Sequence, residues 1–330
     1  MRPIRWGIIA TGSIAHKFAS DLALAPDAEL TAVGSRRMES AETFSAQYGA
    51  RRAYGSYADV AADPDVDVVY VATPHALHRD NVELCIAGGK AVLCEKAVAL
   101  NGNDAGAMVA AARAAGVFFM EAMWMRCNPN IRALQALLDE GAIGEVRRID
   151  ASFGFVADKP PEHRLFDPAL GASSLLDIGI YPLTFAWMLL GAPTQISSSG
   201  QLSDRGIDLA CASVLSYGDG REARISCSML EELSCTATIE GSTGRVEVAA
   251  RFHEAREFTV TTDAGRSTHS DILRGLGYLH EVEEVHRCLR DGRAESPLVP
   301  LDDTIALMRI MDTIRAQIGS TLPGDEAFSP

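Results

Sequence analysis

The feature that most constrains the fold is a regular alternation of apolar runs and helical segments over the first third of the chain. The apolar runs lie at 4–10, 30–35, 67–72, 91–95 and 117–120, and the helical segments at 14–25, 38–48, 81–87 and 103–115. The run at 67–72 lacks polar–apolar alternation, as a strand covered on both faces requires. Strands that alternate with helices form βαβ units. We therefore predict an α/β protein whose N-terminal domain is a Rossmann doubly wound parallel sheet.

The pattern changes after about residue 124. A helix at 130–140 is followed by segments of two-residue periodicity at 146–155, 210–217, 223–229, 235–241, 245–249 and 257–262. Glycine-rich turns separate them, which is typical of hairpins. We expect an α+β second domain built on a large, mostly antiparallel open sheet. The expected domains are 1–123 and 124–330, with the closing helices at 278–290 and 302–318, the second packing back on the first domain. The tail after Gly319 is expected to be disordered.

Composition excludes several classes of function. The formal charge of −14 argues against nucleic-acid binding, which needs a basic surface. The seven cysteines are scattered without a CxxC pair, so we expect reduced thiols, no metal site and a cytoplasmic protein. No signal peptide precedes the first apolar run, and no apolar run looks long enough to span a bilayer. Neither a membrane nor a nucleic acid is therefore expected as a partner.

The first candidate site is the segment GIIATGSIA at 7–15, which follows a strand and opens a helix. Gly12 lets the backbone approach a pyrophosphate, and the helix N-terminus offers free N–H groups. Ala10 stands where the motif has its first glycine, and Thr11, Ser13 and Ile14 complete the candidate cofactor turn. The alternative is a strand–helix turn that needs glycine for geometry alone.

The second candidate lies at the end of the next strand, in AVGSRR. An NAD site typically places an acidic residue there to bind the ribose 2′-hydroxyl. Here Ser35, Arg36 and Arg37 occupy the position. Because a guanidinium can pair with a 2′-phosphate, we predict NADP as the cofactor, with Arg36 as its main contact and NAD as the other choice. The alternative is a pair of solvated surface charges.

The third candidate combines VATPHALH with CEKAVAL, which follow two further strands. Doubly wound sheets bind ligands at the carboxyl ends of their strands. The candidate cofactor residues there are Thr73, Pro74, His75, His78, Glu95 and Lys96. The two histidines lack a third metal ligand and suit hydrogen bonding in a loop better. A lysine at this edge can hold substrate hydroxyls and lower the pKa of a neighbouring acid.

The fourth candidate is GASSLLDIGIYPL at 171–183. Pro182 is tolerated in the first turn of a helix, so Tyr181 is expected at that helix's start and Asp177 in the loop before it. A nearby ammonium and a helix N-terminus would favour the phenolate and make Tyr181 a usable base. The alternative is a tyrosine that packs on the core.

Together these segments, with EAMWMRCNP at 121–129, resemble the Gfo/Idh/MocA family of NAD(P)-dependent oxidoreductases. The family usually reads Glu-Lys-Pro where this chain has Glu95-Lys96-Ala97, and many members carry histidine at the position of Tyr181. The tyrosine and EAMWMR resemble the branch of dimeric dihydrodiol dehydrogenases, which also act as NADP-dependent D-xylose dehydrogenases.

The resemblance implies a mechanism and an assembly. Lys96 and Tyr181 would meet in a cleft, where Tyr181 takes the proton of a hydroxyl while a hydride moves to the nicotinamide. Asp177 would orient a second hydroxyl, and Trp124 and Arg126 would line the substrate pocket. Interdomain packing is the alternative role for Trp124. The substrate would be a small hydroxylated molecule such as a sugar, polyol or dihydrodiol, and the assembly a homodimer through the open sheet.

Two other functions remain alternatives. A hydrolase of the same superfamily uses NAD to oxidise a sugar transiently and releases no reduced cofactor. A regulator would bind NADP without turnover, and it would need neither Lys96 nor Tyr181.

Overall fold

The protein, described here by a computed structural model for residues 2–325, divides into two compact units. The first unit comprises the chain up to Cys127 together with 274–305, and the second comprises 128–273 and the residues from Ala306 onward. This division differs from the expected one in two ways. The first unit extends to Cys127 and not to residue 123, and the C-terminal segment 274–305 also belongs to it. Helix α9 (Leu301–Ile318) is divided, with its first residues in the first unit and the rest in the second.

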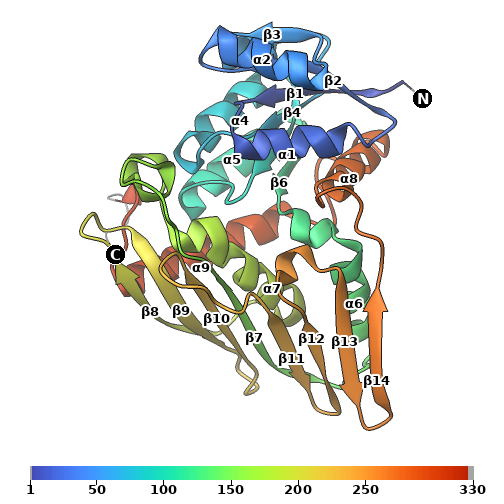
Figure 1. Cartoon of the computed structure of the whole chain (residues 1–330), viewed down its shortest axis with the longest axis vertical. Helices are drawn as coiled ribbons and strands as arrows, with labels where there is room; N and C mark the ends of the chain where they lie inside the picture. Colours follow the sequence, from blue (N-terminus) through green and yellow to red (C-terminus); the bar gives the residue numbers. More distant parts are fainter. Residues whose placement is uncertain (1, 326–330) are drawn as a thin grey trace. The chain divides into compact units, whose positions relative to one another are not determined.

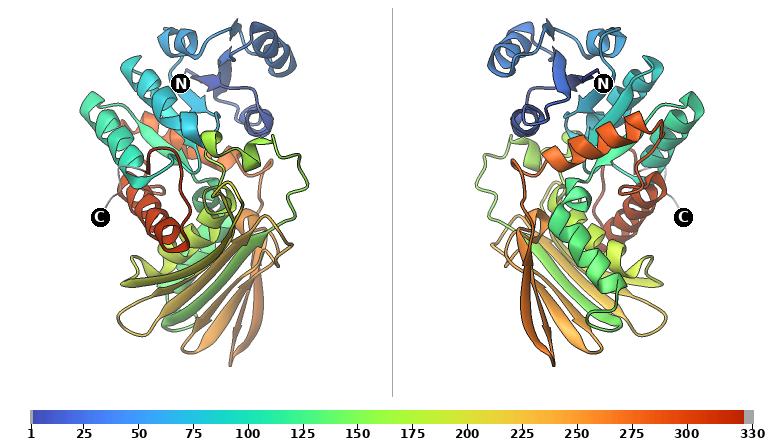
Figure 2. Two further views of the ribbon diagram at one scale, coloured as in Figure 1. Left: turned by 90° about the vertical axis from the view of Figure 1, so that its left-hand side faces the viewer. Right: turned by 90° about the vertical axis from the view of Figure 1, so that its right-hand side faces the viewer.

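The first unit is built on a six-stranded parallel sheet of strand order β3-β2-β1-β4-β5-β6, as expected for a Rossmann fold. The strands are β1 (Ile4–Ile9), β2 (Ala28–Gly34), β3 (Arg52–Tyr54), β4 (Val68–Val71), β5 (Ala91–Glu95) and β6 (Phe119–Ala122). The helices are α1 (Ser13–Leu22), α2 (Met38–Tyr48), α3 (Tyr57–Ala62), α4 (His78–Ala87), α5 (Gly102–Ala115) and α8 (Leu279–Arg290). Figures 1 and 2 show α4 and α5 on one side of this sheet and α1 and α8 on the other.

Helix α8 joins the first unit through buried polar contacts. The carboxylate of Asp21 in α1 accepts hydrogen bonds from the amides of Tyr278 and Leu279 at the start of α8, at 2.8 and 3.1 Å. Trp6 of β1 donates to Nε2 of His286 at 2.9 Å. These donors and acceptors would be left unsatisfied if α8 were removed, so α8 is an integral part of this unit's core.

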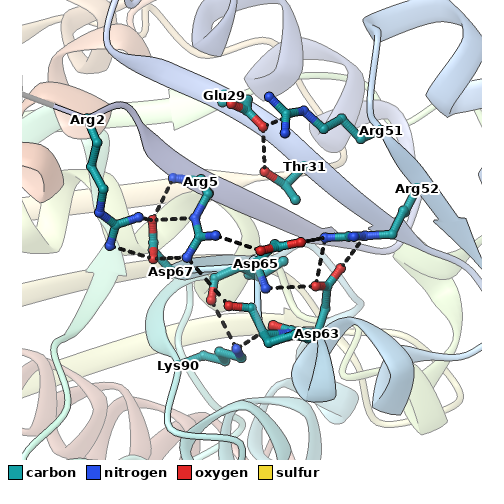
Figure 3. Close-up of polar contacts among 12 residues, drawn as sticks. Arg2, Arg5, Glu29, Thr31, Arg51, Arg52, Asp63, Asp65, Asp67 and Lys90 are labelled. Carbon is teal, nitrogen blue, oxygen red and sulfur yellow. Dashed lines mark hydrogen bonds and ion pairs between the residues drawn. The ribbon is translucent and has the colours of Figure 1, made fainter.

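An ionic network lies at the amino ends of the parallel strands (Figure 3). Arg5 binds Asp67 and Asp65, and Arg52 binds Asp63 and Asp65. Hydrogen bonds from Arg5 and Arg2 outweigh burial and lower the pKa of Asp67 to about 2. The network lies at the edge of the sheet opposite to the carboxyl ends, so we assign it a structural role.

The second unit is built on an eight-stranded sheet of order β14-β13-β12-β11-β7-β10-β9-β8. Its strands are β7 (Val146–Gly154), β8 (Gln195–Leu202), β9 (Asp208–Ser216), β10 (Glu222–Ser228), β11 (Ala237–Gly241), β12 (Gly244–Val248), β13 (Glu257–Thr262) and β14 (Gly265–Ser270). All neighbours are antiparallel except β7 and β10. Helices α6 (Pro129–Asp139) and α7 (Ile180–Leu190) cover one face (Figure 2). The expected fold class is therefore confirmed.

Four short or polar elements were not predicted from the sequence: β3, α3, β8 and β14. Strand β3 has three residues and α3 has six, too few to show a periodicity. Strands β8 and β14 lie at the two edges of the large sheet, and their sequences QISSSGQL and GRSTHS carry few apolar residues. Edge strands bury little side-chain surface, so their sequences carry a weak signal.

Two expectations about apolar and terminal segments need correction. The helical stretch Pro168–Leu190 is long and apolar enough to cross a membrane by length and composition, and 78% of an apolar 18-residue window in it is buried inside the protein, as in a core helix. The tail after Gly319 is ordered as far as the structure describes it: Leu322 is buried and Asp325 forms an ion pair with Arg315. The rest of the tail, 326–330, lies outside the described residues.

Candidate functional site

The turn between β1 and α1 has room for a ligand that the chain itself does not fill. Gly12 has extended backbone (φ −79°, ψ 178°), which any residue can adopt, and a Cβ placed on it would meet no atom within 4 Å. Gly12 provides no side-chain cap, so the first-turn N–H groups of α1 are available to an anion. Ala10 has φ 78°, in the left-handed region that favours glycine. Ser13 is exposed, while Thr11 and Ile14 are half-buried.

At the carboxyl end of β2 the three predicted residues have different environments. Ser35 is buried and receives a long hydrogen bond of 3.5 Å from the Thr11 hydroxyl. Arg36 and Arg37 are exposed, and across residues 2–325 neither forms an ion pair with a carboxylate. Burial raises the pKa of Tyr57, and the neighbouring Arg36 opposes that rise, which places this guanidinium beside the Tyr57 hydroxyl. Two cations without acidic partners therefore stand where an NAD site has a carboxylate.

The histidines after β4 hold the loop that carries Lys96. His75 Nε2 lies 3.2 Å from the carbonyl oxygen of Lys96. His78 is fully buried, with Nδ1 3.0 Å from the Ala97 oxygen and Nε2 2.7 Å from the Thr73 oxygen. Burial, aided by the charge of His75, lowers the pKa of His78 to about 3, so the ring is neutral and donates from one nitrogen. His78 therefore has no exposed ring atom for a cofactor, and it holds the chain beside Pro74 in place.

Lys96 follows β5 directly and is half-buried, and the Lys96–Ala97 peptide bond is cis. The preceding Glu95 is buried and accepts a hydrogen bond from the Tyr70 hydroxyl and another, at 3.2 Å, from the Lys96 amide. Burial and the charge of Glu95 raise the pKa of Tyr70 well above its usual value, so this phenol stays protonated. Glu95, the last residue of β5, thus accepts a hydrogen bond from the main chain of Lys96 at the carboxyl edge of the sheet.

Sequence reasoning missed Glu121, the first residue of the segment EAMWMRCNP. It lies in β6 opposite Cys94 of β5 and is buried. Its carboxylate accepts hydrogen bonds from the Val98 amide and the Thr304 hydroxyl, both at 3.0 Å. Burial raises its pKa to about 7, although Thr304, Val98, Arg126 and Lys96 all lower it. An acidic residue within a buried strand was the signal available in the sequence.

The two residues predicted to line the substrate pocket, Trp124 and Arg126, lie on a 3-10 turn at Trp124–Cys127. The Trp124 ring is buried, 5.1 Å from the ring of Tyr278. Arg126 is 10% exposed and pairs with Asp303 at 2.7 Å. Both side chains therefore have partners within the first unit, and their place in a substrate pocket stays a prediction.

In the second unit, Asp177 and Tyr181 lie on one continuous helical stretch, which corrects the expectation of a loop before α7. Asp177 belongs to a π-helical turn, Leu175–Gly179, that runs directly into α7. The wider π turn precedes Pro182, which lacks an N–H group and would clash with the carbonyl oxygen one α-turn earlier. Tyr181 is therefore not at a free helix N-terminus. The carboxylate of Asp208, which accepts from the Leu175 amide at 2.8 Å, lies at the true start.

Aromatic and charged neighbours surround these two residues within the second unit. The Tyr181 ring is buried, with ring centroids 4.9 Å from His253 and 5.8 Å from Phe153. His253 stacks on Phe153 at 4.3 Å. Arg164 lies 3.5 Å from the carboxylate of Asp177. A tyrosine held by aromatic rings and a carboxylate beside an arginine suit a site for a polar substrate with an apolar face.

The predicted residues thus form two sets, each held within one unit. The first unit carries Lys96 with the cofactor turn and the Arg36 loop, and the second carries Asp177 with Tyr181. The pairing of Lys96 with Tyr181 stays a prediction.

Known proteins match the chain over both units. Residues 4–123 match the family model described as "Oxidoreductase family, NAD-binding Rossmann fold", and residues 131–247 match the "GFO/IDH/MocA C-terminal domain". Trans-1,2-dihydrobenzene-1,2-diol dehydrogenase of Mus musculus is 37% identical over 335 residues, covering 98% of this chain and 99% of that protein. The enzyme of the same name from Bos taurus is 35% identical over 336 residues, with the same coverage.

Solved structures show the same fold. KijD10, a 3-ketoreductase from Actinomadura kijaniata in complex with NADP and TDP-benzene, has a TM-score of 0.87 at 26% identity and covers 96% of this chain and 98% of its own. The aldose-aldose oxidoreductase of Caulobacter crescentus, complexed with glycerol, has a TM-score of 0.87 at 25% identity, covering 96% and 97% of the two chains. With two family models and full-length relatives above 30% identity, the chain belongs to the Gfo/Idh/MocA family and is an NAD(P)-binding oxidoreductase.

Proposed function

We propose that this oxidoreductase uses NADP(H) to interconvert a hydroxyl and a carbonyl group on a sugar, polyol or dihydrodiol. The observation that carries the proposal is the pair of cations, Arg36 and Arg37, which have no carboxylate partner among residues 2–325 and lie at the same sheet edge as Gly12 and Lys96. Parallel strands place all four residues at their carboxyl ends, where doubly wound sheets bind dinucleotides. The relatives named above are a dihydrobenzenediol dehydrogenase, a 3-ketoreductase and an aldose-aldose oxidoreductase, and these names support a hydroxyl or carbonyl group as the reacting group.

The cofactor preference follows from charge. A 2′-phosphate beside a carboxylate would be repelled, whereas beside Arg36 it gains charge-assisted hydrogen bonds. Replacement of Arg36 by alanine should weaken NADP(H) binding by about 10- to 100-fold, since a hydrogen bond to a charged group contributes roughly 1.5–3 kcal/mol. NAD(H) binding should change little. Fluorescence titration with both cofactors measures this, and Arg37→Ala is the matched control with a smaller expected effect. Equal losses for the two cofactors would contradict the assignment.

Gly12 offers a second test of cofactor binding. Valine at this position needs no unusual backbone conformation, and its Cβ meets nothing within 4 Å, so Gly12→Val should leave the melting temperature unchanged. The same side chain would occupy the space of the pyrophosphate, and NADP(H) affinity should fall by about 100-fold or more, on the order of 3 kcal/mol. Gly106→Val in α5 is the control, because its Cβ also meets open space. Unchanged NADP(H) binding in Gly12→Val would place the phosphates elsewhere.

The chain's own groups would supply the proton chemistry. Bound NADP supplies a nicotinamide ring that accepts or donates a hydride at C4. In the oxidative direction, the Tyr181 oxygen takes the proton of the substrate hydroxyl. Lys96 places a positive charge beside the phenolate and the substrate oxygen, which stabilises both as charge develops. Asp177, with Arg164 beside it, orients a second hydroxyl of the substrate.

A screen of NADP+ reduction across aldoses, inositols and trans-dihydrodiols tests the function. We expect net NADPH formation with at least one of these classes. An NAD-dependent glycoside hydrolase would cleave a glycoside without net NADPH, and a regulator would bind NADP without turnover, so either result would overturn the proposal. A glycoside-cleavage assay on the same protein then separates the two alternatives, because only the hydrolase would cleave.

We also propose that the protein is a cytoplasmic homodimer. All seven cysteines are free thiols, and six of them are buried, as suits a reducing compartment. The face of the large sheet opposite α7 carries serine, threonine and alanine side chains around a hollow of about 450 Å³. Small side chains on a broad open sheet allow close approach of a second copy, as in the isologous contacts of two-fold dimers.

A further inference from the structure

Glu121 is a buried acidic group that contacts the loop after Lys96 from the neighbouring strand β6. It is 1% exposed, in the fully buried strand β6. A buried carboxylate is costly unless hydrogen bonds and opposite charges compensate for its lost hydration. The partners that stabilise Glu121 therefore indicate what it does.

Each oxygen of Glu121 has a different partner. One oxygen accepts from the Val98 amide, two residues after Lys96, and the other accepts from Thr304 in the first turn of α9. His75 and His78 contact the carbonyl oxygens of Lys96 and Ala97. The main chain from Lys96 to Val98 is thus held at every residue, and Glu121 contributes the contact at Val98.

The charged side chains near Glu121 lie on the segments that contact it or lie next to them. Lys96 and Arg126 both act on the Glu121 carboxylate as positive charges, and Arg126 is paired with Asp303, next to Thr304. Cys94 faces Glu121 from β5, and burial raises its pKa, with the charges of Glu95 and Glu121 adding to the rise. Glu121 is the acidic group of β6 whose charge interacts with that of Lys96. Loss of the Glu121 charge would weaken its hydrogen bond to the Val98 amide and change the electrostatic potential at the Lys96 ammonium.

We propose that Glu121 is a positioning residue for Lys96, whose carboxylate fixes the Lys96–Val98 loop and orients the lysine ammonium for turnover. The inference rests on the proposed function, in which Lys96 acts on the substrate. Only the ionised carboxylate accepts from both donors with full strength, because a protonated acid must donate from one oxygen. Since the pKa of Glu121 is about 7, turnover should fall as the pH drops below neutrality.

Glu121→Gln removes the charge and keeps the shape and hydrogen-bonding reach. We expect kcat to fall by about 10- to 100-fold, with KM and NADP(H) affinity within about threefold of the original. The acidic limb of the kcat profile near pH 7 should disappear. Unchanged kcat, or a limb that persists in the variant, would overturn the proposal. If kcat falls only in proportion to the amount of folded protein, the role of Glu121 is merely structural, and this result would also overturn the proposal.

Thr304→Val is the second variant and keeps the carboxylate. It removes one hydrogen bond that lowers the pKa of Glu121, so the acidic limb should move to higher pH. An unmoved limb would contradict the assignment of that ionisation to Glu121.

A measurement that does not need turnover separates this inference from the proposed function. The chain has four lysines, at 17, 90, 96 and 159, so ¹³C-methylated lysines give few NMR signals. The signal absent in Lys96→Met should shift with a midpoint near pH 7 in the original protein and lose that transition in Glu121→Gln. If the transition is seen but no NADPH forms in the screen, the proposed function fails and the contact stands. If NADPH forms without the transition, the inference about Glu121 fails.

Discussion

Tyr181→Phe is expected to reduce turnover by about a hundredfold to ten-thousandfold and to leave NADP(H) binding intact. General acid–base catalysis contributes roughly 10²–10⁴-fold, and the phenylalanine ring retains the packing against His253 while losing the proton acceptor. Lys96→Met should have an effect of the same order, because the ammonium stabilises the developing charge. Single-turnover NADPH formation and NADP(H) titration together distinguish loss of chemistry from loss of binding.

Tyr217→Phe is the matched control for the tyrosine. Tyr217 is buried in the same unit, and its hydroxyl has no hydrogen-bond partner among residues 2–325, so the substitution should leave kcat unchanged. Full activity in Tyr181→Phe, or equal losses in both tyrosine variants, would remove Tyr181 from the reaction. Retained activity in Lys96→Met would do the same for the lysine.

The sequence predicted the features that depend on local pattern. Strand β5 and helix α2 were predicted with the bounds that the structure shows, because a buried strand is continuously apolar and Gly49 ends the helix with φ 75°. The strand–turn–helix at Gly12 and the arginines after β2 were also predictable, because neighbouring residues in the sequence define them. Each is a short segment whose chemistry follows from its own residues.

The features that depend on distant partners could not be predicted. Asp177 looked like a loop residue, because a π turn before Pro182 has no sequence pattern of its own. His78 looked like a cofactor contact until the loop at Ala97 was seen to cover it. Glu121 acquires its environment from Thr304, 183 positions later in the chain, and no local pattern reports such a contact.

Glu281 is the clearest case of an environment made by tertiary packing. It lies on α8 with 0% exposure, and within residues 2–325 neither of its carboxyl oxygens has a hydrogen-bond partner. Burial raises its pKa well above the usual value, and the charges of Glu95 and Asp21 add to the rise. The folded protein therefore favours the protonated form of this side chain, because an ionised carboxylate would be costly there.

This environment makes the stability of the protein depend on pH. Above the ordinary pKa of a glutamic acid, near 4.5, the unfolded chain releases the proton while the folded protein keeps it. The free energy of unfolding therefore falls as the pH rises, by up to about 1.4 kcal/mol per pH unit, until the folded pKa is reached. Below pH about 4.5 both states are protonated and this loss is absent.

Glu281→Gln should remove that dependence, because glutamine resembles the protonated acid and has no proton to release. The stability gained over the original protein should be small near pH 5 and should grow with pH up to the folded pKa, as measured by urea unfolding across that range. Glu283→Gln, on the exposed side of the same helix, is the control and should show no gain that grows with pH. A constant difference between the Glu281 variant and the original protein would mean that Glu281 is ionised in the folded state. In that case a neighbouring group would have to compensate the negative charge of Glu281.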